Sequence, residues 1–143
     1  MRLGDGLLRS TFEELNSGEV IVLPTSRWMR VYTFYRILKS LEPDAIVFHF
    51  LTIDQAVMAW VARRLGVSSL LAAAGNPAPR NRLPRLKLMA TIRLNRHIHC
   101  PIVCASRWVE KSLSETAVLP RWSCVVYNAV DVEVFGSVRS MRP

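Results

Sequence analysis

Apolar residues along this chain follow two alternating patterns. Five short runs rich in Val, Ile, Leu and Ala predict β-strands at residues 19–23, 44–50, 68–74, 102–105 and 123–127. Between these runs, apolar residues recur every three or four positions, which predicts helices at 27–41, 53–65, 83–97 and 107–114. Strands that are apolar along their whole length suit a parallel sheet covered on both faces. The sequence therefore predicts an α/β fold with a doubly wound, mostly parallel sheet of about five strands.

Local signals mark the ends of these helices. Gln55 follows Thr52 by three residues, which is the spacing of a capping box, and Gly66 ends the same helix. The first helix has an amphipathic pattern made by Trp28, Val31, Tyr32, Tyr35 and Leu38. Ligands of such folds bind beyond the carboxyl ends of the strands, so the loops that follow the strands are the places to look for a site.

The composition is that of one globular domain in a reducing compartment. The chain has 143 residues, half of them hydrophobic, and a net charge of +8, which favours an anionic partner. Its three cysteines have no regular spacing, and we expect Cys104 and Cys124 to be buried in strands. Neither a secretory signal nor a membrane span is visible in the sequence, which predicts a cytoplasmic protein. We assign 1–18 to a segment of unclear structure, 19–135 to the domain, and 136–143 to a linker or tail.

A family resemblance is carried by the last third of the chain. From residue 102 it reads I-V-C-A-S-R-W-V-E-K-S-L and, after a short loop, V-V-Y-N-A-V-D-V-E-V-F. Two earlier stretches, P-D-A-I-V-F-H at 43–49 and G-N-P at 75–77, occur in the same order as in that family. Together they resemble the N-terminal domain of glycosyltransferase family 4, whose members have the GT-B fold of two Rossmann-like domains. The resemblance covers residues 40 to 135.

The resemblance implies half of a retaining glycosyltransferase, which moves a sugar from a nucleotide-sugar donor to a hydroxyl acceptor. This chain would be the acceptor-side domain, and we expect it to lack an N-terminal strand and the C-terminal donor-binding domain with its E-x7-E motif. That second domain, in cis or in trans, is the implied partner, and this chain alone is expected to be inactive. No cofactor or metal is expected within it.

Residues matched to the family's motifs are the candidate site. His49, Gly75, Asn76 and Ser106 would contact the acceptor, while Asn128, Asp131 and Phe135 would form the interdomain loop. The four acceptor candidates also have a purely structural interpretation: His49 as a histidine satisfied at a strand end, Gly75 and Asn76 as turn residues, and Ser106 as a helix N-cap. The turn reading gives Gly75 a backbone conformation that other residues cannot adopt.

Two positions depart from the family pattern. Many members carry a histidine at the end of the third predicted strand, where this chain has Ala72, Ala73 and Ala74. An alanine accepts no proton, so a general base cannot be carried onto this strand, and the catalytic residues stay unknown. Ala129 replaces the family's usual glycine in the interdomain loop.

Basic residues gather in and around the third predicted helix, the leucine-rich one at 83–97. They are Arg80, Arg82, Arg85, Lys87, Arg93 and Arg96. A basic amphipathic helix suits an anionic membrane surface and, within the family, a lipid-linked acceptor at the inner face of the membrane. The plainer reading is a helix whose leucines pack on the sheet and whose arginines are solvated.

Two other functional classes compete with the enzyme reading. One is a non-catalytic Rossmann-like binding module whose basic surface contacts nucleic acid or a membrane, although the chain has no helix-turn-helix, RNA-binding sheet signature or aromatic stacking ladder. The other, a receiver-like domain, requires an acidic cluster at the end of the first strand, where this chain has Leu23 and Pro24. We also expect self-association through apolar surface exposed at the domain edge.

Overall fold

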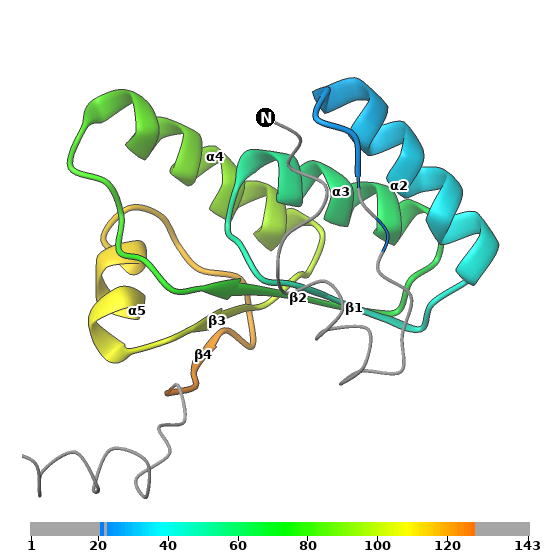
Figure 1. The fold of residues 1–143 in the computed structure, drawn as a ribbon. Helices are drawn as coiled ribbons and strands as arrows, with labels where there is room; N and C mark the ends of the chain where they lie inside the picture. The colour runs from blue at the N-terminus through cyan, green and yellow to red at the C-terminus, as the bar shows by residue number, and fades with distance from the viewer. Residues whose placement is uncertain (1–20, 22, 128–143) are drawn as a thin grey trace, which may run out of the picture.

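The computed structural model describes residue 21 and residues 23–127, and contains there a mixed α/β fold (Figure 1). Its helices and strands alternate in the order α2 (Arg27–Leu41), β1 (Ala45–Phe48), α3 (Ile53–Arg64), β2 (Ser69–Ala74), α4 (Arg82–His97), β3 (Ile102–Cys104), α5 (Arg107–Ser114) and β4 (Cys124–Val125). The four strands form one parallel sheet in the order β1-β2-β3-β4. This arrangement confirms the predicted α/β class and parallel sheet, and it is compatible with a Rossmann-like fold. The predicted strand at 19–23 lies mostly outside the described residues, and residues 21 and 23 are not in a strand.

Local signals in the sequence set the helix ends. Thr52 accepts a hydrogen bond from the backbone N–H of Gln55 at 3.2 Å, and Ser106 accepts one from Val109 at 3.2 Å, so both act as N-caps. Gly66 has a φ of 93°, a left-handed conformation that glycine adopts without strain, and it ends α3 as predicted. The boundaries of α2 and α5 agree with the sequence prediction.

Within residues 23–127 the helices cover one face of the sheet, whereas the sequence predicted a doubly wound sheet with helices on both faces. Figure 1 shows α2, α3 and α4 side by side above the strands, and α5 shares a core with them through Leu113. Each successive strand is added on the same side of the previous one, so right-handed crossovers place the connecting helices on a common face. No helix among residues 23–127 covers the opposite face.

Burial along the strands follows from this one-sided layering. Side chains that point toward the helices are buried, among them Ala72, Ile102 and Cys104. Their neighbours along the strands point to the other face, where Val47 is 55% exposed. Cys124 is also exposed, so the prediction that it is buried was wrong, whereas Cys104 is buried as predicted. Within the described residues, these apolar strands are therefore covered by helices on one face of the sheet.

The inward face of α2 differs from the amphipathic pattern expected from its aromatic residues. Leu38 is buried and Phe34 packs against the core, with its ring centroid 6.1 Å from that of Phe48. Trp28 and Tyr32 are not part of this core and are 82% and 56% exposed. Because α2 carries apolar residues around most of its circumference, the spacing alone did not decide which of them pack.

Candidate functional site

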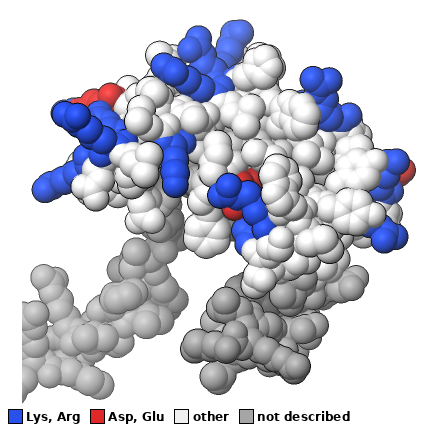
Figure 2. Space-filling model, turned by 90° about the horizontal axis from the view of Figure 1, so that it is seen from above, with Lys and Arg blue, Asp and Glu red and all other residues white. Residues whose placement is uncertain are grey.

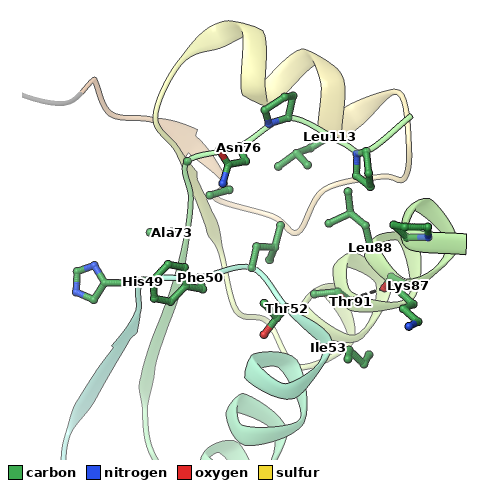
Figure 3. A pocket seen from close by; sticks show the side chains of 16 residues that line it. His49, Phe50, Thr52, Ile53, Ala73, Asn76, Lys87, Leu88, Thr91 and Leu113 are labelled. Atoms are coloured by element: carbon green, nitrogen blue, oxygen red, sulfur yellow. Dashed lines mark hydrogen bonds between the residues drawn. The ribbon is translucent and has the colours of Figure 1, made fainter. Parts of the chain in front are cut away.

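A pocket of about 380 Å³ opens at the carboxyl ends of β1 and β2, between the loops that follow these strands and the helices α4 and α5 (Figure 3). This is the edge of a parallel sheet at which ligands of α/β proteins bind. The loop after β1 contributes His49, Phe50, Leu51, Thr52 and Ile53; β2 and its loop contribute Ala73, Ala74, Gly75, Asn76, Pro77 and Pro79; α4 and α5 contribute Pro84, Lys87, Leu88, Thr91 and Leu113.

Apolar groups form most of the wall. Leu113 is fully buried and Leu88 packs against the core, which fixes the floor and one side. Phe50 is 75% exposed at the mouth, although it is large and apolar. A pocket of this kind suits a ligand with an apolar body and a few polar groups.

Three polar side chains of different chemistry lie around this wall. Asn76 supplies an amide that can both donate and accept hydrogen bonds, Lys87 supplies an ammonium group, and His49 supplies an imidazole. Figure 3 shows Asn76 near Leu113, Lys87 on α4 at the other side of the pocket with its ammonium end directed away from Asn76, and the ring of His49 turned outward at the rim. The hydroxyl of Thr91 is already engaged, since it donates to the carbonyl of Lys87 at 2.9 Å.

Hydrogen bonds between elements hold the loops of the site. The backbone N–H of Ala105 donates to the carbonyl of Ala74 at 3.0 Å, which fixes the end of β2 next to the end of β3. Two residues beyond Asn76, the N–H of Ala78 donates to Oγ of Ser112 on α5 at 3.0 Å. Asn76 therefore lies in a loop that is attached at both ends.

The structure brings together some of the residues predicted for the site and separates others. His49, Gly75, Asn76 and Lys87 line one pocket. Ser106 does not line it, and its hydroxyl caps α5. The remaining basic residues of the predicted cluster are exposed outside the lining, namely Arg80, Arg82, Arg85, Arg93 and Arg96. Asn128, Asp131 and Phe135 lie outside the described residues.

Gly75 does not have the role that its turn suggested. Its φ is not in the left-handed range, and a Cβ at this position would meet no atom within 4 Å. The backbone therefore tolerates a side chain here, which corrects the expectation that the turn requires glycine. The missing side chain instead leaves open space at the pocket rim.

Sequence reasoning missed the apolar half of the pocket. Leu88 and Leu113 lie on different helices, and their shared position depends on how α4 and α5 cross the sheet. Phe50 offered a usable signal, because a large apolar residue directly after a strand, at the ligand-binding edge of an α/β sheet, marks a loop worth inspecting.

Comparison of the chain with models of known protein families, with curated proteins and with solved structures gives no significant match. Within the described residues, none of the helices has the length and apolar character needed to cross a membrane.

Proposed function

We propose that this chain is the acceptor-side domain of a retaining glycosyltransferase similar to family 4. The supporting observation is that His49, Gly75 and Asn76, which the sequence resemblance assigns to the acceptor, line one pocket at the carboxyl edge of the sheet. The three residues come from two separate loops. A pocket that brings them together is what an acceptor-binding domain of this kind would need. The intact enzyme would transfer a sugar from a nucleotide-sugar donor to a hydroxyl of the acceptor.

The pocket residues would bind different parts of an acceptor, according to their chemistry. The Asn76 amide would hydrogen-bond a sugar or polyol hydroxyl, and the open space at Gly75 would let the ligand approach the backbone. Lys87 would attract a negative charge, such as the phosphate of a lipid-linked acceptor, while the apolar wall takes the attached hydrocarbon. An acceptor with a polar head, an anionic link and an apolar tail would match all three parts.

Proton transfer would depend on His49 or on the second domain. The pocket section of β2 consists of alanines, which accept no proton. The imidazole of His49 has a nitrogen that can accept a proton, and rotation of its side chain from the rim would bring it toward a bound hydroxyl. We expect the chain alone to bind acceptor and to transfer little or no sugar without a donor-binding domain.

Binding of short alkyl glycosides to the isotope-labelled chain tests the proposal by amide chemical shifts in NMR spectra. We expect saturable shifts at Gly75, Asn76 and Thr91, and weaker binding in Asn76→Ala and Gly75→Leu. His99→Ala is the matched control, because His99 is exposed and borders a hollow at the opposite, amino-terminal edge of the sheet. Shifts that are absent, or that map to the hollow around His99, would contradict an acceptor site here.

The alternative is a non-catalytic module that binds an anionic partner through its basic residues. The favouring observation is that α4 contains five Lys or Arg residues and no Asp or Glu. The two proposals differ in salt dependence, since phosphate-backbone or membrane contacts weaken steeply as salt rises. Glycoside binding in the apolar pocket should change little over the same range.

A further inference from the structure

The outer surface of the helical layer carries a combination of side chains that the pocket does not use. This outer face is formed by the sides of α2, α3 and α4 that point away from the sheet (Figures 1 and 2). The helices are neighbours, since α3 packs against both α2 and α4. Large apolar residues are exposed on all three: Trp28, Met29 and Tyr32 on α2, Trp60 on α3, and Leu83 and Leu86 on α4.

Basic side chains surround these apolar groups. Figure 2, which looks down on the outer face, shows blue patches spread over it with uncharged surface between them and little red. The exposed basic residues of the three helices include Arg36, Lys39, Arg64, Arg82, Arg93 and Arg96. A membrane-binding α4 alone, as the sequence suggested, would leave the aromatic residues of α2 and α3 unexplained.

Negative charge is almost absent from the three helices. Asp54 is their single carboxylate, and it is paired with two arginines: Arg27 at 2.9 Å and Arg30 at 3.5 Å. Among the described residues, no other ion pair involves these helices. Most of the positive charge on the outer face is therefore available to an external partner.

We propose that the outer face of α2, α3 and α4 docks onto an anionic phospholipid bilayer. Trp and Tyr side chains partition to the boundary between lipid headgroups and hydrocarbon, because one part of each is apolar and another is polar. Arg and Lys attract acidic headgroups while their aliphatic stems lie along apolar surface. The inference rests on this surface and stands whether or not the pocket binds a glycosyl acceptor.

Charge and composition favour a bilayer over the other candidate occupants. A second copy of the chain would bring the same positive face against itself, which is repulsive. A nucleic acid would satisfy the basic residues, but phosphates gain nothing from exposed Met29, Leu83 and Leu86. A bilayer takes up both kinds of side chain at once. Pro84 and Lys87 of α4 line the pocket beside Leu83 and Leu86, so the docked surface would adjoin the pocket mouth.

The first test is co-sedimentation of the full chain with vesicles of equal parts phosphatidylcholine and phosphatidylglycerol, against phosphatidylcholine alone. We expect binding to the anionic vesicles that weakens at high salt. The variant Arg36→Gln, Arg64→Gln, Arg93→Gln should lose on the order of 100-fold in affinity, since each basic residue near such a surface contributes about fivefold. The matched control Arg107→Gln, Lys111→Gln, Arg121→Gln removes the same charge outside the three helices and should bind as the parent does. Equal losses in the two variants, or no binding to anionic vesicles, would overturn the proposal.

A second measurement reports the docked face directly. Brominated lipids quench tryptophans that lie in the bilayer, so the variant Trp108→Phe, Trp122→Phe, which keeps Trp28 and Trp60, should be quenched. The converse variant, Trp28→Phe, Trp60→Phe, should not be quenched. Quenching in the converse variant alone would show that another surface docks. If single-stranded RNA binds more tightly than the vesicles, and if the triple arginine variant loses this RNA binding, the outer face binds nucleic acid. That result would refute the bilayer proposal.

Discussion

Gln55 on α3 and Asn95 on α4 exchange two hydrogen bonds across a buried helix interface. Nε2 of Gln55 donates to Oδ1 of Asn95 at 3.2 Å, and Nδ2 of Asn95 donates to Oε1 of Gln55 at 3.3 Å. Nδ2 of Asn95 also donates to the carbonyl of Thr91 at 2.9 Å. Within the described residues no buried side-chain polar atom lacks a partner, so this amide pair is satisfied and fixes the register between the two helices.

Removing both partners of this pair should cost less than the sum of the two single losses. Asn95→Ala leaves the amide of Gln55 buried without its partner, and we expect a loss of about 2–4 kcal/mol in the free energy of unfolding. The double variant Gln55→Leu, Asn95→Leu should lose less than the sum of the two single leucine variants, because no polar group is then left unpaired. Urea unfolding followed by circular dichroism measures the parent and the four variants. Additive effects would show that the two amides do not depend on each other.

Arg63 joins the end of α3 to two other segments, 67–68 and 98–99, and its loss should be strongly destabilising. Its guanidinium donates to the carbonyls of Val67, Ser68 and Ile98 at 2.8–3.1 Å, and to that of His99 at 3.3 Å. We expect Arg63→Met, which keeps the aliphatic stem, to lower the free energy of unfolding by about 2 kcal/mol.

Two comparisons isolate the guanidinium of Arg63. Arg63→Lys should recover less than half of the loss, since a lysine cannot reproduce the planar arrangement of donors. Arg64→Met is the control at the next position, where the exposed guanidinium lies over the ring of Trp60 at 5.2 Å, and it should change stability by less than about 0.5 kcal/mol. Similar losses for Arg63→Met and Arg64→Met would mean that the carbonyl contacts contribute little.

The elements of this fold were predictable because local chemistry sets their ends. Thr52, Gly66 and Ser106 act where the sequence placed them, at helix boundaries that depend on neighbouring backbone alone. Which side of a helix packs against the sheet was less predictable. Trp28 and Phe34 are both aromatic residues of α2, and which of them packs depends on the position of Phe48 in a strand.

The pocket shows the same division between local and long-range information. His49, Gly75 and Asn76 follow strands, so the general rule for α/β sheets placed them at one edge. Lys87 was grouped with surface arginines, because a helical pattern does not tell which turn crosses above a neighbouring loop. Within residues 23–127 no helix lies on the sheet face of Val47 and Leu71, and the sequence did not predict this, because both residues have the apolar character of strands that are covered on both faces.

Replacement of Ser106 tests whether this residue serves α5 alone. Its hydroxyl accepts from Val109 N–H, so Ser106→Ala should lower the free energy of unfolding by about 1 kcal/mol, and Ser106→Asp should restore it. Asn81→Ala is the control, because Asn81 precedes α4 without a side-chain capping bond and its replacement should be close to neutral. If Ser106→Asp is as stable as the parent and yet both variants lose glycoside binding, the residue contacts ligand as well as capping the helix.

The cysteines should differ in reactivity according to their burial. Burial raises the pKa of Cys100 from 9.0 to about 11, partly opposed by Arg63, and it raises that of Cys104 to about 11, with a further contribution from Glu110. Both thiols are therefore protonated and shielded at neutral pH, whereas Cys124 is exposed. A thiol-specific reagent should modify Cys124 alone in the native protein, and unfolding should expose all three. Rapid modification in Cys124→Ala would contradict this assignment.

The raised pKa values also predict how stability depends on pH. A thiol whose pKa is higher in the folded state holds its proton more tightly there, so its contribution is complete below pH 9.0 and is lost as the pH rises through about 11. The free energy of unfolding should therefore fall over this interval by at most on the order of 2 kcal/mol for each thiol. The measurement compares the parent with Cys104→Ala by urea unfolding at several pH values, so that contributions common to the two proteins cancel. Cys104→Ala should be less stable at neutral pH because of the cavity, but its stability should fall less steeply above pH 9.0. Parallel curves for the two proteins would show that ionisation of Cys104 does not oppose folding.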